Sequence, residues 1–228
     1  MMNITKHIPN TVTCLNLLMG CIGTYFAFQG DYQWALVCIL VAGLFDFFDG
    51  MFARLLNAYS AIGKQLDSLA DVISFGMLPG AMVFTILSQT ELHGLFALTG
   101  FLIPIFSALR LAKFNIDERQ SESFLGLAVP ANAIFWGGAI FAFSDFFLFQ
   151  PWFLVALVLL FCALLVSEIP MFSLKMKNLK WSDNKTQYIF LLGCVILLAT
   201  LRLKAFAAII AWYIVLSILV ALLCRKSK

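Results

Sequence analysis

Residues 46–71 read DFFDGMFARLLNAYSAIGKQLDSLAD, and this stretch sets four aspartates between two strongly apolar segments. Asp46 and Asp49 end one apolar run, and Asp67 and Asp71 open the next. An ionisable side chain at membrane depth costs about 2.5–3.5 kcal/mol on insertion. Four such side chains in so short a stretch indicate a functional site between two helices.

The composition around this stretch indicates a membrane protein. Of the 228 residues, 62% are hydrophobic and 12% are charged, with a mean hydropathy of +0.96. Soluble domains have about 45–50% apolar and about 25% charged residues. The six cysteines form no CxxC pair and there are only two histidines, so a zinc site, a disulfide framework and a Ser-His-Asp triad are poorly supported.

Apolar runs long enough to cross a bilayer recur along the chain, since a span needs roughly 20 residues. We expect an all-α, polytopic transmembrane helical bundle with about eight spans. The expected spans are 10–28, 33–55, 72–89, 94–114, 126–144, 151–169, 186–201 and 205–223. No soluble domain or long linker interrupts them, so residues 1–228 are expected to form a single integral membrane domain.

The basic residues favour one orientation. With eight spans and a cytoplasmic N-terminus, all of the 15 Lys and Arg residues except Arg202 and Lys204 fall on the cytoplasmic side. This asymmetry follows the positive-inside rule and places both termini in the cytoplasm. Residues 1–8 are expected to lie at the interface and lead into a retained helix rather than a cleaved signal peptide.

The spacing of the aspartates suits a metal site. Asp46 and Asp49 are three residues apart and Asp67 and Asp71 four apart, so each pair shares one helical face. Carboxylates that converge in a semi-apolar cleft repel each other, and a divalent cation removes the repulsion. Hard cations such as Mg²⁺ and Mn²⁺ prefer these oxygen ligands. The alternative is that the acids reach water or pair with Arg54 and Lys64.

Small and basic residues accompany the acids. Gly50 and Gly63 would let a bulky group approach the helix backbones, and Arg54 offers a planar set of donors suited to phosphate oxygens. A glycine in a membrane helix more often marks tight helix packing. Together with the acids, however, these residues favour a ligand that carries phosphate.

The full pattern is Asp46-x2-Asp49-Gly50-x2-Ala53-Arg54-x8-Gly63-x3-Asp67-x3-Asp71. It resembles the signature of the CDP-alcohol phosphatidyltransferase family at all eight defining positions. The resemblance implies a six-helix catalytic core, here at about residues 8–145, with additional C-terminal spans within 151–228. It also implies transfer of a phosphatidyl group from a CDP-activated lipid to an alcohol, with release of CMP.

The resemblance assigns roles to individual residues. Two Mg²⁺ or Mn²⁺ ions would be held by Asp46, Asp49, Asp67 and Asp71, and Asp71 would be the general base that takes the proton of the acceptor hydroxyl. The nucleotide would lie near Asn10, Thr13, Gly50, Ala53, Arg54 and Gly63. Asn10 and Thr13 belong to a polar stripe with Asn16 that could instead bond to a neighbouring helix.

Three further segments resemble the phosphatidylserine synthase branch of the family. They read DSLADVISFGMLPG at 67–80, RLAKFN at 110–115 and FLGLAVPA at 124–131. Lys113 stands where arginine is common, and Ala128-Val129 departs from an expected Gly-Leu-Pro-x-Pro-Ala pattern. L-serine would then be the acceptor, and Arg110, Lys113 and Asn115 are the candidates for binding it or a lipid phosphate. The two cations, Arg110 and Lys113, could also serve only to set the membrane topology.

Other readings remain open at this point. Phosphatidylglycerophosphate synthase would use glycerol 3-phosphate, a dianion that needs a denser basic pocket. A divalent-cation transporter would hold its acids near the bilayer midplane. The expected partners are CDP-diacylglycerol, L-serine, membrane lipids and, as often in the family, a second copy of the chain in a homodimer; no nucleic acid is expected. The expected location is the cytoplasmic (inner) membrane of a prokaryote, with the active site facing the cytoplasm.

Overall fold

The structure, a computed structural model, describes residues 7–117, 124–174, 180–181 and 184–226. The predicted all-α membrane bundle is confirmed by its long apolar helices. The α-helices are α1 (Ile8–Phe28), α2 (Tyr32–Leu55), α3 (Ala61–Asp71), α4 (Leu78–Ser88), α5 (Leu102–Ile116), α6 (Val129–Phe149), α7 (Pro151–Val166), α8 (Lys185–Leu201) and α9 (Ala205–Lys226). The first six residues and most of the basic loop 175–185 lie outside the described residues.

The third span begins earlier than the sequence predicts. A π-helical turn, Val72–Met77, joins α3 to α4, so Ala61–Ser88 is one helical segment of 28 residues. The predicted start at residue 72 is therefore wrong. Ser60 caps the helix by accepting a hydrogen bond from the Gly63 N–H at 3.0 Å. Hydropathy misses this first part because α3 is amphipathic, with a polar face that lowers its average.

The span count is only partly matched by helix length. Six helical segments are long and apolar enough to cross a membrane, whereas α7, with 16 residues, is shorter. One of the six is an apolar stretch of 39 residues that contains both α8 and α9. A short 3₁₀ turn with φ +52° at Arg202 separates these two helices. Each of the eight expected spans thus coincides with a helical segment, and eight crossings remain a prediction.

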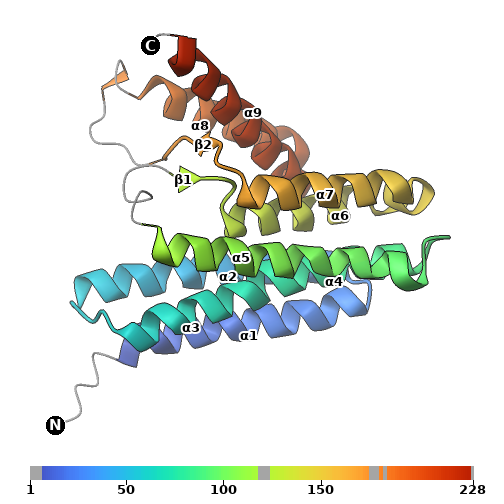
Figure 1. Ribbon diagram of the computed structural model, residues 1–228, viewed down its shortest axis with the longest axis horizontal. Coiled ribbons are helices and arrows are strands. Elements are labelled where there is room, and N and C mark those ends of the chain that lie inside the picture. The colour runs from blue at the N-terminus through green and yellow to red at the C-terminus, as the bar shows by residue number, and fades with distance from the viewer. Residues whose placement is uncertain (1–6, 118–123, 175–179, 182–183, 227–228) are drawn as a thin grey trace.

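The helices form successive layers (Figure 1). Helices α1 to α4 lie together, α5 runs between this group and the α6–α7 layer, and α9 is inclined across the far side of α6. The beginning of α1 and the end of α9 lie at the same end of the bundle. That end also carries the connection between α2 and α3.

A short strand pair, which the sequence analysis did not predict, tethers the start of α6. Strand β1 (Phe124–Leu125) pairs in antiparallel register with β2 (Pro170–Met171), and Phe124 lies opposite Met171. Gly126 follows with φ +74°, and its N–H donates to the Ile169 carbonyl at 2.9 Å. The pair holds the segment after α7 beside the N-terminus of α6.

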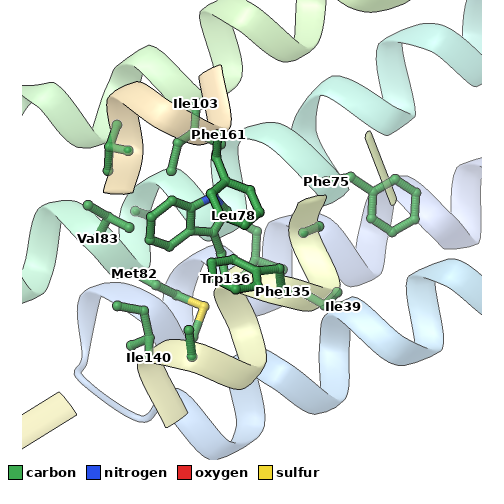
Figure 2. Packing of buried hydrophobic residues seen from close by; sticks show 14 of the residues in the cluster. Ile39, Phe75, Leu78, Met82, Val83, Ile103, Phe135, Trp136, Ile140 and Phe161 are labelled. Carbon is green, nitrogen blue, oxygen red and sulfur yellow. The ribbon is translucent and has the colours of Figure 1, made fainter. Parts of the chain in front are cut away.

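The buried core lies between the layers (Figure 2). Trp136 of α6 is fully buried, and its ring centroid lies 5.5 Å from that of Phe161 of α7. Phe135 stacks on Phe161 at 3.9 Å. In lipid such contacts stabilise through van der Waals packing rather than by removing apolar surface from water. They hold α6 against α7.

Candidate active site

Three carboxylates meet between the second half of α2 and the middle of α3. Ligand oxygens of Asp46, Asp49 and Asp67 all lie within 4.8 Å of one another. The two helices are joined by a short connection, residues 56–60, which includes Asn57 at φ +48°. This tight reversal brings the late residues of α2 opposite the middle of α3. The geometry therefore unites three of the four aspartates that the sequence analysis selected.

Asp71 lies at the end of α3, beside this carboxylate cluster of Asp46, Asp49 and Asp67. It is 7% exposed and near enough to Asp46 and Asp67 to interact with them electrostatically. Its Oδ1 accepts a hydrogen bond from the Asn16 amide nitrogen at 3.3 Å. The π-helical turn that begins at the next residue places Asp71 at a local irregularity, and π-helical turns are frequent at functional sites.

Helix α1 supplies neutral donors to the acids. The Thr13 hydroxyl donates to Asp49 Oδ2 at 2.7 Å. The hydroxyl of Ser74, a residue of the π-helical turn, donates to the Asn16 carbonyl at 2.9 Å. The polar stripe on α1 thus contacts the acidic residues directly. Asn10, the remaining residue of the stripe, lines the adjacent cavity, and Thr13 lines this cavity as well.

That cavity has a volume of about 280 Å³. Its lining comes from α1, α2, α3 and the connection between α2 and α3: Pro9, Asn10, Thr13, Asp49, Gly50, Ala53, Ala58, Tyr59, Ser60, Gly63, Lys64 and Asp67. Five of the six residues predicted for the nucleotide are present. Arg54 is not among them, although its Nη1 comes within 3.9 Å of where a Gly50 side chain would begin.

Two glycines shape this cavity in different ways. A Cβ on Gly50 would meet only Arg54, so this position faces open space. A Cβ on Gly63 would come within 2.9 Å of both Asn10 Oδ1 and Ser60 Oγ. Gly63 therefore permits the close approach of α1 to α3 and leaves Asn10 at the cavity wall.

The residues predicted to bind the acceptor separate into two groups. Lys113 forms an ion pair with Glu168 at 3.4 Å, and the Asn115 amide donates to Ser68 Oγ at 2.8 Å. Both residues therefore already have protein partners. Arg110 differs, because it is 7% exposed and interacts electrostatically with Asp71.

The donors of Arg110 are incompletely used. Its Nε and Nη2 are buried without a hydrogen-bond acceptor, and its guanidinium carbon lies 5.1 Å from the centroid of the Phe114 ring. Leaving a buried charged donor unpaired costs more than the ~1–3 kcal/mol of a neutral one. Such a group is a candidate for binding an anionic ligand.

Sequence reasoning missed several polar residues near these groups. Ser107 precedes Arg110 by three residues on α5 and is fully buried without a partner for its hydroxyl, and Asn132 of α6 is fully buried with both amide atoms unpaired. Lys64, considered in the sequence only for topology or as a partner of the acids, lines the cavity and donates to the Asn115 carbonyl at 3.1 Å. In the sequence, Ser107 and Asn132 are marked only by being polar residues inside apolar runs.

The carboxylate cluster fits a divalent cation. Among the described residues, no ion pair joins any of the four aspartates to Lys, Arg or His, so the expected alternative of pairing with Arg54 and Lys64 is not seen. Asp67 Oδ1 is buried and has no donor. An all-carboxylate set of oxygens without a counter-charge matches the ligands that Mg²⁺ and Mn²⁺ prefer.

Comparison with known proteins adds an independent line of evidence. A family model described as CDP-alcohol phosphatidyltransferase matches residues 6–167. The chain is 34% identical over 125 residues to the CDP-diacylglycerol–serine O-phosphatidyltransferase of Bacillus subtilis, which covers 55% of this chain and 70% of that protein.

Two further relatives have serine in their names. The CDP-diacylglycerol–serine O-phosphatidyltransferase of Mycobacterium tuberculosis is 31% identical over 230 residues, covering 96% of this chain and 76% of that protein. The archaetidylserine synthase of Methanothermobacter thermautotrophicus is 32% identical over 129 residues, covering 56% of this chain and 54% of that protein. The chain therefore spans about half to three quarters of the length of these relatives.

Proposed function

The chain belongs to the CDP-alcohol phosphatidyltransferase family, and from this membership we propose that it transfers the phosphatidyl group of CDP-diacylglycerol to L-serine. The serine hydroxyl oxygen forms a bond to the phosphorus that carries the diacylglycerol, and the bond from that phosphorus to the CMP oxygen breaks. The products are phosphatidylserine and CMP. The observation that carries the proposal is the carboxylate cluster, two members of which line the 280 Å³ cavity.

The cavity is the proposed binding site of the cytidine nucleotide. Asn10 and Thr13 offer polar groups on the α1 side, while Gly50, Ala53 and Gly63 provide a surface without bulky side chains. Arg54 at the exposed end of α2 would contact phosphate oxygens as the nucleotide enters. The donor's diphosphate would then lie against Asp49 and Asp67.

The four aspartates would hold Mg²⁺ or Mn²⁺, two ions by analogy with the family. When bound, such ions neutralise charge on the diphosphate and on the leaving group. The protein's own contribution is to fix the acids before the substrate arrives. Thr13 and Asn16 of α1 hold Asp49 and Asp71 in place through hydrogen bonds.

Asp71 is the proposed general base. Asn16 binds its Oδ1, which leaves Oδ2 to accept the proton of the serine hydroxyl. Asp71 and Arg110 are both almost fully buried, and their charges are close enough to interact. In this proposal an acceptor bound at Arg110 presents its hydroxyl to Asp71.

Arg110 is the proposed partner of the serine carboxylate. A bidentate contact between guanidinium and carboxylate would use the two donors that have no acceptor in the protein. Lys113 and Asn115, engaged with Glu168 and Ser68, would support this region rather than bind the acceptor. A single buried cation suits a carboxylate better than the dianionic phosphate of glycerol 3-phosphate, which favours serine over that alternative.

The assay that tests the proposal measures CMP release by the purified protein. CDP-diacylglycerol and Mg²⁺ or Mn²⁺ are supplied with L-serine, glycerol 3-phosphate or inositol phosphate in parallel reactions. We expect CMP release only in the reaction that contains serine as the acceptor, and we expect this release to be lost when EDTA removes the metal. Release with glycerol 3-phosphate instead would transfer the assignment to that acceptor, and no release with any acceptor would revive the cation-transporter alternative.

The protein is an integral membrane protein, and its membrane and sidedness are further proposals. The membrane is proposed to be the cytoplasmic membrane of a prokaryote, and the Lys and Arg distribution supports an orientation with the acids on the cytoplasmic side. A homodimer is proposed from the family resemblance and is testable by the mass of the purified protein in detergent.

A further inference from the structure

Ser74 joins α1 to the helical segment that carries Asp71. It belongs to the π-helical turn Val72–Met77 and is fully buried. Its hydroxyl donates to the Asn16 carbonyl at 2.9 Å, across 58 sequence positions. Several other hydroxyls in the bundle donate to a carbonyl of their own helix, as Ser217 of α9 does to the Tyr213 carbonyl at 2.8 Å. The bond from Ser74 therefore connects two helices.

Asn16 is bonded twice to this segment. Its backbone carbonyl accepts from Ser74, and its side-chain amide nitrogen donates to Asp71 Oδ1 at 3.3 Å. Ser74 and Asp71 are three residues apart in the continuous helical segment Ala61–Ser88. The two hydrogen bonds therefore close a ring between α1 and that segment, and this ring restricts the orientation of the Asp71 carboxylate more than a single bond would.

The amide of Asn16 depends on its own backbone for its position. Its Oδ1 is buried and has no hydrogen-bond partner, so within the part of the chain that the structure describes the side chain bonds to Asp71 alone. The amide therefore lies where the Asn16 backbone places it. The Ser74 hydroxyl holds this backbone against the π-helical turn.

Gly20 allows α1 to approach the turn this closely. A Cβ on Gly20 would lie 2.7 Å from Ser74 Cα and 2.9 Å from Ser74 N, so a side chain there would push α1 away. On the same face of α1, three residues before Asn16, Thr13 donates to Asp49 of the carboxylate cluster at 2.7 Å. One helix face thus holds both the proposed base and a member of the cluster, and Ser74 fixes that face on the side of the base.

We infer that Ser74 is a positioning residue for Asp71: by fixing Asn16, it holds the carboxylate in the orientation that takes the proton of the acceptor hydroxyl. The inference rests on the proposed function and extends the site to a residue that acts through Asn16. A displacement of about 1 Å in a positioned group can cost about 10²-fold in rate. The effect of Ser74 should therefore appear in kcat and should depend on Asp71.

The test is a double-mutant cycle on CMP release by the full-length protein, with Ser74→Ala, Asp71→Asn and the double variant. Alanine removes the hydroxyl and adds no atom that could collide with α1. We expect Ser74→Ala to lower kcat about fivefold, the factor that one neutral hydrogen bond represents, and to leave both KM values within about twofold. In the Asp71→Asn background the same change should not lower kcat further, because the group through which Ser74 acts is gone.

Two further variants sharpen the comparison. Ser217→Ala is the matched control, since Ser217 is also buried but bonds within α9, and it should change neither kcat nor KM. Asn16→Ala removes the link between Ser74 and Asp71 and should also lower kcat selectively. Folding is checked by Tm in detergent, and if Ser74→Ala does not fold, Ser74→Cys, a weaker donor of similar shape, takes its place in the cycle.

The possible outcomes separate this inference from the proposed function. A merely structural role for Ser74 would raise a KM value or lower kcat by the same factor in both backgrounds, and either result would overturn the inference. An unchanged kcat in Ser74→Ala would overturn it as well, while leaving the proposed function intact. If the wild type uses a different acceptor, the serine assignment fails and the cycle is measured with that acceptor; if no acceptor releases CMP, both ideas are refuted.

Discussion

At the scale of single residues, the site depends on how two charged groups are held. Asp71 receives one hydrogen bond from Asn16 and lies near Arg110, while Arg110 packs on Phe114 and keeps two donors unused. Each group is almost fully buried. Their arrangement supports a role in proton removal for Asp71 and in anion binding for Arg110.

The variant Asp71→Asn tests the first role. The amide keeps the shape of the side chain but cannot accept the proton of the acceptor hydroxyl. We expect kcat to fall by roughly 10²–10⁴-fold, the range that general bases contribute. Nucleotide binding should remain, so that adding CDP still raises the Tm of the variant. Steady-state CMP release and thermal unfolding in detergent provide the two measurements, and near-normal turnover would exclude Asp71 as the base.

At the scale of elements, the close contact of α1 with α3 forms one wall of the cavity that we propose binds the nucleotide. Gly63 allows this contact, since any side chain there would collide with Asn10 and Ser60. Ser60 is at the same time the cap of α3. The first turn of α3, from Ser60 to Gly63, therefore couples three features: the beginning of the helix, the cavity wall and the placement of Asp67.

Replacing Gly63 by alanine should separate the two helices locally. We expect kcat/KM for CDP-diacylglycerol to fall by up to about 10²-fold, because small displacements of positioning groups are that costly. Titration of CDP against Tm would report the weaker nucleotide binding. Gly43→Ala is the matched control, because a Cβ on Gly43 of α2 would meet no atom within 4 Å; equal effects of the two changes would argue against the role given to Gly63.

At the scale of the whole molecule, the beginning of α1, the end of α9 and the connection between α2 and α3 lie at one end of the bundle (Figure 1). An even number of crossings puts both termini on one side of the membrane. The asymmetric distribution of Lys and Arg selects the cytoplasmic side. The substrates and the acidic site would then share that compartment.

Protease-sensitive tags at the two termini test this topology. We expect both tags to be cleaved in inverted membrane vesicles and both to be protected in right-side-out spheroplasts. A cytoplasmic marker and a periplasmic marker control for vesicle orientation. Cleavage of one tag in each preparation would mean an odd number of spans and would contradict the predicted eight.

The amino-acid sequence by itself determined the membrane character, the approximate helices and the aspartates of the carboxylate cluster. These follow from local information, because apolar run length, helical spacing and the signature at 46–71 are properties of neighbouring residues. It did not locate the start of α3, where a polar helical face lowers the hydropathy, or the β1–β2 pair, which depends on residues more than 40 positions apart.

Only the tertiary structure decided which polar groups meet. Thr13 contacts Asp49 across 36 positions and Asn16 contacts Asp71 across 55. Lys113 likewise finds Glu168 after α7 and Asn115 finds Ser68 of α3, whereas Arg110 of the same helix keeps two donors unpaired. Spacing along one helix defines a shared face, but the partner that this face meets is set by the packing of the whole bundle.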